Sequence, residues 1–235
     1  SAEILGMKIP YTEDEINKAC MQACEVQGFT DAYIRPVVWR GSEMMAVAAQ
    51  GTKIHVAIAA WQWGSYFDPK EKMKGIRLDV SDWKRPAPDT APTSAKAAGL
   101  YMICTMSKHA AEAKGYADAM MFDYRGYVAE ATGANMFFVK DEKLYTPDPD
   151  CFLNGITRQS VLALAKARQI PVIVKHIEKS ELDGFTECFL TGSAAEVTPV
   201  SEIGPWKFTP GKITETLMTD YHADVNAPVS AVKLG

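Results

Sequence analysis

The chain has 235 residues, of which 47% are hydrophobic and 23% charged, and its formal net charge is −4 at pH 7. This length and composition are typical of a globular enzyme with one large or two modest domains. The negative charge argues against binding to nucleic acid or to anionic membranes, and no apolar run is long enough to span a bilayer. Five scattered cysteines and four histidines without ligand spacing predict free thiols in a reducing cytoplasm and no metal site.

The first part of the chain predicts one helix and two strands. A capping box at residues 12–15 opens a helix that continues, with apolar residues at helical spacing, until Gly28. Residues 31–39 alternate as a strand, which places Tyr33, Arg35, Val37 and Trp39 on one face, and Pro36 predicts a sheet edge or a bulge there. Residues 53–61 predict a buried strand.

The stretch 68–75, which carries a proline, a glycine and several charges, is the best candidate for a linker. We therefore expect a small N-terminal domain over residues 1–67 and a larger domain over residues 76–235. The chain opens at Ser1 without a methionine, so we also expect that the beginning of the small domain is missing.

The remainder of the chain interleaves helices with strands, several of which are joined by hairpins. The predicted strands are 76–81, 119–124, 127–131, 135–140, 143–146, 172–177, 187–191 and 196–199, and the predicted helices are 93–114, 155–168 and 213–221. Hairpin connections require antiparallel neighbours, so the sequence predicts the α+β class with mixed or antiparallel sheets.

Lys96 is a candidate for imine formation with an aldehyde. It stands among Ser, Ala and Gly residues, where small neighbours admit a flat ring and apolar neighbours disfavour the ammonium form of a buried amine. Taken alone, such a lysine is far more often a solvated residue on a helix. Its meaning depends on the motifs that follow.

Two glycine-containing turns predict anion sites. Residues 153–158 lead into a helix, whose free N–H groups and dipole attract an anion together with the hydroxyl of Thr157. Residues 190–195 lie between two strands, where successive N–H groups can form a concave nest. Each turn alone is more often a plain cap or loop, and neither has the spacing of a nucleotide-binding motif. Together with a buried lysine, they suggest one phosphate group held from two sides.

Glu130 ends a strand that is otherwise apolar. A carboxylate at such a position needs a partner. One alternative is an ion pair with a nearby lysine or arginine. The other is an interaction with the protonated nitrogen of a pyridoxal ring.

Six motifs in chain order resemble the class IV pyridoxal-phosphate aminotransferases, and most of all their branched-chain amino acid aminotransferases. They are residues 33–36, 61–66, Lys96 with Tyr101, 130–135, 155–158 and 191–200. The motifs keep the order and approximate spacing of the family over almost the whole chain, from Ser1 to about Asp224. The resemblance implies the two-domain class IV fold, also called D-amino acid aminotransferase-like, and pyridoxal 5′-phosphate as cofactor.

The resemblance also implies a role for each cofactor-binding residue. Lys96 would bind the cofactor covalently and move the proton during the reaction, and Tyr101 would hydrogen-bond the ring oxygen. Glu130 would pair with the ring nitrogen, and Leu153 would pack on the ring face. The phosphate would be bound by the two turns, through Gly155, Ile156, Thr157, Gly192 and Ser193.

A substrate pocket is implied in the same way, by Tyr33, Arg35, Trp63, Tyr66, Ser193, Ala194 and Ala195. Tyr33 and the turn after Gly192 would bind the α-carboxylate. Arg35 with Tyr66 would bind the distal carboxylate of glutamate, and Trp63 would line an apolar side-chain pocket. An ion-paired arginine and a core tryptophan are the structural alternatives for Arg35 and Trp63.

The implied reaction transfers the amino group of leucine, isoleucine or valine to 2-oxoglutarate, as in branched-chain amino-acid biosynthesis, in a cytoplasmic homodimer or higher homo-oligomer. Alternatives with the same fold are a D-amino acid transaminase, an (R)-amine transaminase and an aminodeoxychorismate lyase. An alternative from another class is a non-catalytic protein that binds pyridoxal phosphate or another phosphate ligand. The motifs at residues 33–36 and 61–66 favour the branched-chain enzyme.

Overall fold

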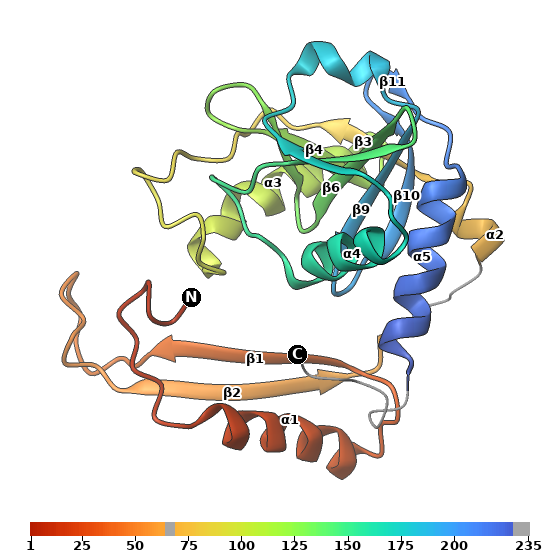
Figure 1. The fold of residues 1–235 in the computed structure, drawn as a ribbon. Helices are drawn as coiled ribbons and strands as arrows, with labels where there is room; N and C mark the ends of the chain where they lie inside the picture. The colour runs from red at the N-terminus through yellow and green to blue at the C-terminus, as the bar shows by residue number, and fades with distance from the viewer. Residues whose placement is uncertain (64–68, 228–235) are drawn as a thin grey trace. The chain divides into compact units, whose positions relative to one another are not determined.

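The computed structural model describes residues 1–63 and 69–227 (Figure 1). The chain folds into two compact units, residues 1–66 and residues 67–235. Within the described ranges, no helix combines the length and the apolar character needed to cross a membrane.

The first unit contains one helix and a two-stranded sheet. Helix α1 (Glu13–Gln27) begins at the predicted capping box, in which Thr12 and Glu15 exchange hydrogen bonds, and it ends at Gly28 in the left-handed conformation. Both helix ends are thus confirmed. The acidic first turn adds a favourable interaction with the helix dipole.

Strands β1 (Tyr33–Arg40) and β2 (Ile54–Trp61) pair antiparallel, with Tyr33 opposite Trp61 and Arg40 opposite Ile54. Pro36 lies within β1, which pairs with β2 alone among the described strands, so its predicted position on an edge strand is confirmed. The expectation that residues 53–61 are buried is wrong, because exposed and half-buried residues alternate along β2. Helix α1 packs against this two-stranded sheet, and a single helix shields one face only.

The second unit is built on a nine-stranded sheet. Its strands are β3 (Ile76–Val80), β4 (Asp118–Phe122), β5 (Val128–Ala131), β6 (Asn135–Lys140), β7 (Lys143–Pro147), β8 (Val172–Lys175), β9 (Glu187–Gly192), β10 (Glu196–Ile203) and β11 (Trp206–Lys207). The order is β5-β4-β3-β10-β9-β6-β7-β8, and β11 pairs with β10. Three pairs, β3 with β10, β3 with β4 and β7 with β8, are parallel and the others antiparallel, so the predicted mixed sheet is confirmed.

The two ends of this strand order meet. Val128 in β5 forms an antiparallel bridge with Ile177, directly after β8, and its N–H group donates to the Ile177 carbonyl at 2.9 Å. The sheet is therefore curled on itself. This closure brings β5, which carries Glu130, toward β6.

The helices of the second unit are α2 (Pro69–Lys72), α3 (Tyr101–Ala113), α4 (Ile156–Ala167) and α5 (Lys212–Val225), with 3-10 turns η1 (Ala98–Leu100) and η2 (Lys179–Gly184). Helices α4 and α5 lie beside β9 and β10 (Figure 1).

Successive residues of β6 contribute to two different hydrophobic cores. Met136 and Phe138 belong to the cluster enclosed by the curled sheet, whereas Phe137 and Val139 belong to the cluster under α4 and α5.

The predicted helix over residues 93–114 begins later than expected. Residues 92–97 form successive turns, η1 follows, and α3 begins only at Tyr101. The reason is packing: Thr93 and Ala95 are buried while Ser94 and Lys96 face outward. This alternation overrides the helical propensity of the alanine-rich stretch.

Candidate active site

Lys96 and Tyr101 face each other across the turn that opens α3. The Nζ atom of Lys96 lies 2.6 Å from the phenolic oxygen of Tyr101, and 5.2 Å from the centre of its ring. Lys96 is exposed, so the expectation of a buried lysine is wrong. Because Ala95 takes the buried position, the amine of Lys96 is accessible to a ligand.

Glu130, at the end of β5, is buried between two polar side chains. Its Oε1 atom lies 3.4 Å from Nε of Arg85, and its Oε2 atom accepts a hydrogen bond from Nδ2 of Asn135 at 3.3 Å. Burial raises the pKa of Glu130 to about 7, against the lowering effect of the charges on Arg85 and Lys96. Glu130 is therefore a carboxyl group that titrates near neutrality and feels the charge of Lys96.

Asn135 links Glu130 to the first glycine turn. Its Nδ2 atom also donates to the carbonyl of Leu153 at 2.8 Å, and its Oδ1 atom accepts from the N–H group of Gly155 at 3.1 Å. A Cβ atom on residue 155 would lie 2.5 Å from Oδ1, so this close approach requires glycine. The sequence reasoning assigned no role to Asn135. The available signal was an amide at the start of the otherwise apolar β6.

The first glycine turn leads into α4 as predicted. Gly155 is the N-cap and provides no side-chain hydrogen bond, so no capping side chain occupies the N–H groups of the first helical turn, and these groups can bind an anion. Thr157 is buried, with its hydroxyl 3.5 Å from that of Tyr221, and Ile156 is exposed. The buried guanidinium of Arg158 fixes the turn by donating to Asn154, to Thr146 and to the carbonyl of Pro147.

The second glycine turn connects β9 to β10. Ser193 and Ala194 are exposed in this turn, and Ala195 is half-buried. The hydroxyl of Thr191 is buried and has no hydrogen-bonding partner among the described residues. Thr191 pairs with Asn135 across β9 and β6, so both side chains lie on the same face of the sheet. An unpaired buried hydroxyl beside Asn135 is a position where a polar ligand supplies the missing partner.

These features fit pyridoxal phosphate. The second unit contains four such features. They are an accessible amine with a phenol at hydrogen-bonding distance, a buried carboxyl group near this amine, a helix N-terminus without a capping side chain, and a buried hydroxyl without a partner among the described residues. They match the needs of an aldehyde, a ring nitrogen and a phosphate. Leu153, predicted to pack on the ring face, is half-buried in the same loop.

The predicted substrate residues of the first unit form an aromatic cluster. The Tyr33 ring lies 5.0 Å from Trp61 and 5.2 Å from Trp63, and the Arg35 guanidinium lies over the rings of Tyr33 and Trp61. Nη2 of Arg35 donates to the hydroxyl of Tyr33 at 3.4 Å. Tyr66 lies outside the described residues. The cluster thus combines aromatic rings with one cation.

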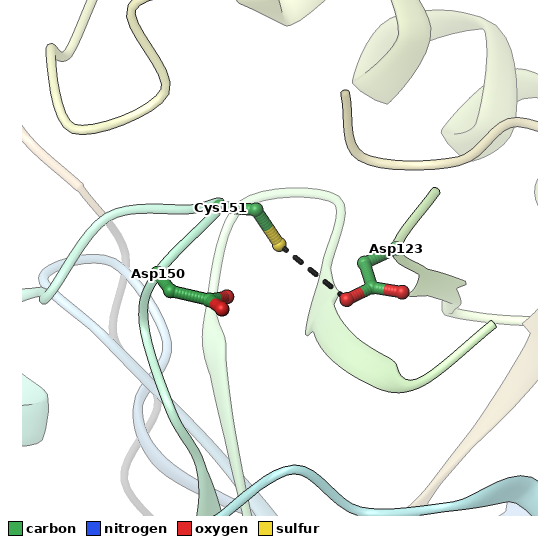
Figure 2. A group of neighbouring side chains, drawn as sticks. All are labelled: Asp123, Asp150 and Cys151. Atoms are coloured by element: carbon green, nitrogen blue, oxygen red, sulfur yellow. Dashed lines mark hydrogen bonds between the residues drawn. The ribbon is translucent and has the colours of Figure 1, made fainter. Parts of the chain in front are cut away.

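Asp123, Asp150 and Cys151 lie together near the loop that carries Leu153 (Figure 2). The thiol of Cys151 lies 3.9 Å from Oδ2 of Asp123, and burial raises the pKa of Cys151 to about 12. Nη2 of Arg125 contacts both carboxylates, at 2.7 Å and 2.8 Å. Since the guanidinium forms ion pairs with both carboxylates and the thiol remains protonated, the group is an ion-paired cluster that holds two loops together.

The family model described as amino-transferase class IV matches residues 1–203. The branched-chain-amino-acid aminotransferase of Pseudomonas aeruginosa is 40% identical over 234 residues, which cover 98% of this chain and 76% of that protein. A solved branched-chain aminotransferase of Thermoproteus uzoniensis with norvaline superposes with a TM-score of 0.90 and 36% identity, over 95% of this chain and 75% of that one. The branched-chain amino acid aminotransferase of Thermobaculum terrenum in its PLP-form gives a TM-score of 0.88 and 27% identity, over 95% and 74% of the two chains.

These matches confirm the family and the fold that the motifs predicted. The identity extends over nearly the whole chain, and the fold agrees over 95% of its length. The chain belongs to the class IV aminotransferase family.

Proposed function

We propose that the chain catalyses transamination between branched-chain L-amino acids and 2-oxoglutarate, with pyridoxal 5′-phosphate as cofactor. Leucine, isoleucine or valine donates the amino group, and the products are the branched 2-oxo acid and glutamate. The relatives named as branched-chain aminotransferases support this choice over the D-amino acid, (R)-amine and lyase alternatives. The observation that carries the proposal is the accessible amine of Lys96, paired at 2.6 Å with the hydroxyl of Tyr101 and coupled electrostatically to the buried Glu130.

Pyridoxal phosphate, when bound, supplies an electron-withdrawing ring that stabilises negative charge at the substrate α-carbon and carries the amino group between the two substrates. Lys96 would be the residue that attaches it, and its Nζ atom would serve as base and acid, moving a proton between the substrate α-carbon and C4′ of the cofactor. The hydroxyl of Tyr101 orients this amine from 2.6 Å away.

Glu130 would interact with the ring nitrogen, and the two glycine turns would bind the phosphate. A carboxylate beside the ring nitrogen favours its protonated form. The N–H groups of Ile156 and Thr157, next to Gly155, and the Thr157 hydroxyl would hold the phosphate on one side, and Gly192 and Ser193 would hold it on the other. Thr191, whose buried hydroxyl has no partner among the described residues, adds a donor on the second side.

Substrate specificity is assigned to the aromatic cluster of the first unit and to the second turn. The N–H groups of Ser193 and Ala194, next to Ala195, bind the α-carboxylate. Arg35, together with Tyr66, binds the distal carboxylate of 2-oxoglutarate and glutamate. Trp63 contacts the branched side chain. The position of the Arg35 guanidinium over two aromatic rings supports this, because one site then offers both a cation and an apolar wall.

We also propose that the protein is cytoplasmic and assembles at least as a homodimer. Five free cysteines, three of them buried, support a reducing compartment. The fully exposed side chains of Met45 and Val47 support association, since large apolar groups in water favour contact with another surface. The division at residues 66 and 67 supports a small domain over residues 1–67, a linker over 68–75 and a large domain over 76–235.

The test is an assay of the purified protein with pyridoxal phosphate, L-leucine and 2-oxoglutarate, in which we expect stoichiometric 2-oxo acid and glutamate. Reduction with borohydride followed by peptide mapping should locate the cofactor on Lys96. Lys96→Ala should abolish both signals, while Lys166→Ala, at an exposed lysine of α4, should change neither.

Other substrates separate the remaining alternatives. Turnover of D-alanine or a chiral (R)-amine, without turnover of L-leucine, would assign another activity of the same fold. Cofactor binding without any turnover would assign a non-catalytic binding protein.

A further inference from the structure

Arg85 is the buried cation beside Glu130. It lies in the loop after β3, and its backbone is fixed to β4, because its N–H group donates to the carbonyl of Phe122 at 2.8 Å. Its side chain is 4% exposed, and its Nη1 atom points to the thiol of Cys104 at 3.6 Å. Among the described residues, Glu130 is the acidic side chain that forms an ion pair with it.

Burial of this guanidinium needs a reason, because a buried charge is costly unless it is paired. The Nε atom of Arg85 lies 3.4 Å from Oε1 of Glu130 but makes no hydrogen bond within the described part of the chain. The thiol of Cys104 is a weak acceptor. The electrostatic interaction with Glu130 is therefore the main compensation that the fold offers Arg85.

Glu130 has two cationic neighbours of different kinds. In the reaction proposed above, Lys96 changes its bonding and its charge, since its amine attaches the cofactor and later carries a proton. Arg85 does not change, because a guanidinium stays protonated at every accessible pH. Arg85 thus provides a constant positive charge beside Glu130. This charge opposes burial, which raises the pKa of Glu130 and favours its neutral form.

We propose that Arg85 is a positioning residue that keeps the carboxylate of Glu130 charged and aimed while the charge on Lys96 changes. One part of the inference rests on the proposed function, namely that the charge of Glu130 interacts with the ring nitrogen of the cofactor. Asn135 holds the other oxygen at 3.3 Å, so the carboxylate is fixed from two sides.

Among the described residues, Arg85 and Lys96 are the charged groups that lower the pKa of Glu130. The thiol of Cys104 lies on α3 and is held protonated, because burial raises its pKa. The negative charge of Asp118 raises the pKa of Cys104, and the neighbouring amide of Asn135 carries no charge. Lys96, which contacts Tyr101, is therefore the competing explanation for the charge of Glu130 and must be tested beside Arg85.

The experiment is a titration of the protein without cofactor, labelled with ¹³C at the glutamate carboxyl carbons. The Glu130 resonance is assigned by its loss in Glu130→Gln. In Arg85→Gln, which keeps a polar side chain without its charge, the midpoint should rise by about one pH unit or more. Arg85→Lys should restore much of the original midpoint, and Cys104→Ala should leave it unchanged.

The Lys96→Ala variant tests whether Arg85 or Lys96 controls the charge of Glu130, even if Arg85→Gln does not fold. A midpoint that moves less than about half a pH unit in Lys96→Ala supports Arg85 as the controlling charge. A rise of a full unit there, or an unchanged midpoint in a folded Arg85→Gln, overturns the inference. Because no cofactor or substrate is present, these results stand whether or not the leucine assay succeeds.

Discussion

The amine of Lys96 and the phenol of Tyr101 lie 2.6 Å apart although one belongs to an irregular segment and the other begins α3. The 3-10 turn η1 between them reverses the chain enough to bring both side chains together. The hydrogen bond fixes a flexible lysine side chain, which would otherwise sample many rotamers. It thus prepares the amine for attack on an aldehyde.

Replacing Tyr101 by phenylalanine should therefore lower kcat while leaving the fold intact. Loss of this hydrogen bond corresponds to a decrease of roughly tenfold in kcat. Steady-state rates with leucine and 2-oxoglutarate measure it, beside Tm. Tyr124→Phe, at an exposed tyrosine, should leave kcat unchanged. Equal kcat in the Tyr101→Phe variant and the original protein would show that this contact has no part in catalysis.

Glu130→Gln should change how stability depends on pH. Burial raises the pKa of Glu130 from 4.5 to about 7 in the folded state, so between these values the folded protein binds more protons than the unfolded one. The contribution of Glu130 to stability is complete below pH 4.5 and is lost as the pH rises through about 7.

Urea unfolding of the cofactor-free protein at several pH values tests this sign. Relative to the original protein, Glu130→Gln should gain on the order of 3 kcal/mol between pH 4.5 and pH 7. Parallel stability profiles for the two proteins would contradict a raised pKa for Glu130.

Arg35→Met should separate the two substrates. The variant keeps an apolar chain beside Tyr33 and Trp61 but loses the cation, so the KM for 2-oxoglutarate should rise about tenfold or more. The half-reaction with leucine, whose side chain carries no charge, should change little. Arg35→Lys should give an intermediate KM. Equal losses for leucine and 2-oxoglutarate would assign Arg35 a structural role.

Glu187→Ala should destabilise the attachment of α5. Oε2 of Glu187, in β9, accepts hydrogen bonds from the N–H group and the hydroxyl of Thr214 at 2.9 Å and 2.6 Å. It thereby caps a helix whose own N-cap, Gly211, has no side chain. We expect a loss of about 1–3 kcal/mol in urea unfolding.

Two further variants control for this effect. Glu187→Gln keeps an acceptor and should lose less. Glu215→Ala, at an exposed residue of the first turn of α5, should have a small effect. If Glu215→Ala and Glu187→Ala destabilise equally, capping by Glu187 is not the cause.

Much of the fold could be predicted because its signals are local. The capping box of Thr12 and Glu15 and the left-handed Gly28 each act within a few residues. The start of α3 differs from the prediction because local signals did not decide it. The alanine-rich stretch near Lys96 favours a helix, but the burial of Thr93 and Ala95 in the folded chain overrides that preference.

The order of residues along the chain was enough to indicate the candidate active-site groups. These are Lys96, Tyr101, Glu130 and the two glycine turns, in an arrangement typical of one family. It took the folded chain to place Arg85 beside Glu130 and to show that Asn135 joins Glu130 to the loop at Leu153. The reason is physical. Periodicity and capping depend on neighbours along the chain, whereas the charge of a buried carboxyl group depends on partners that only the curled sheet brings near.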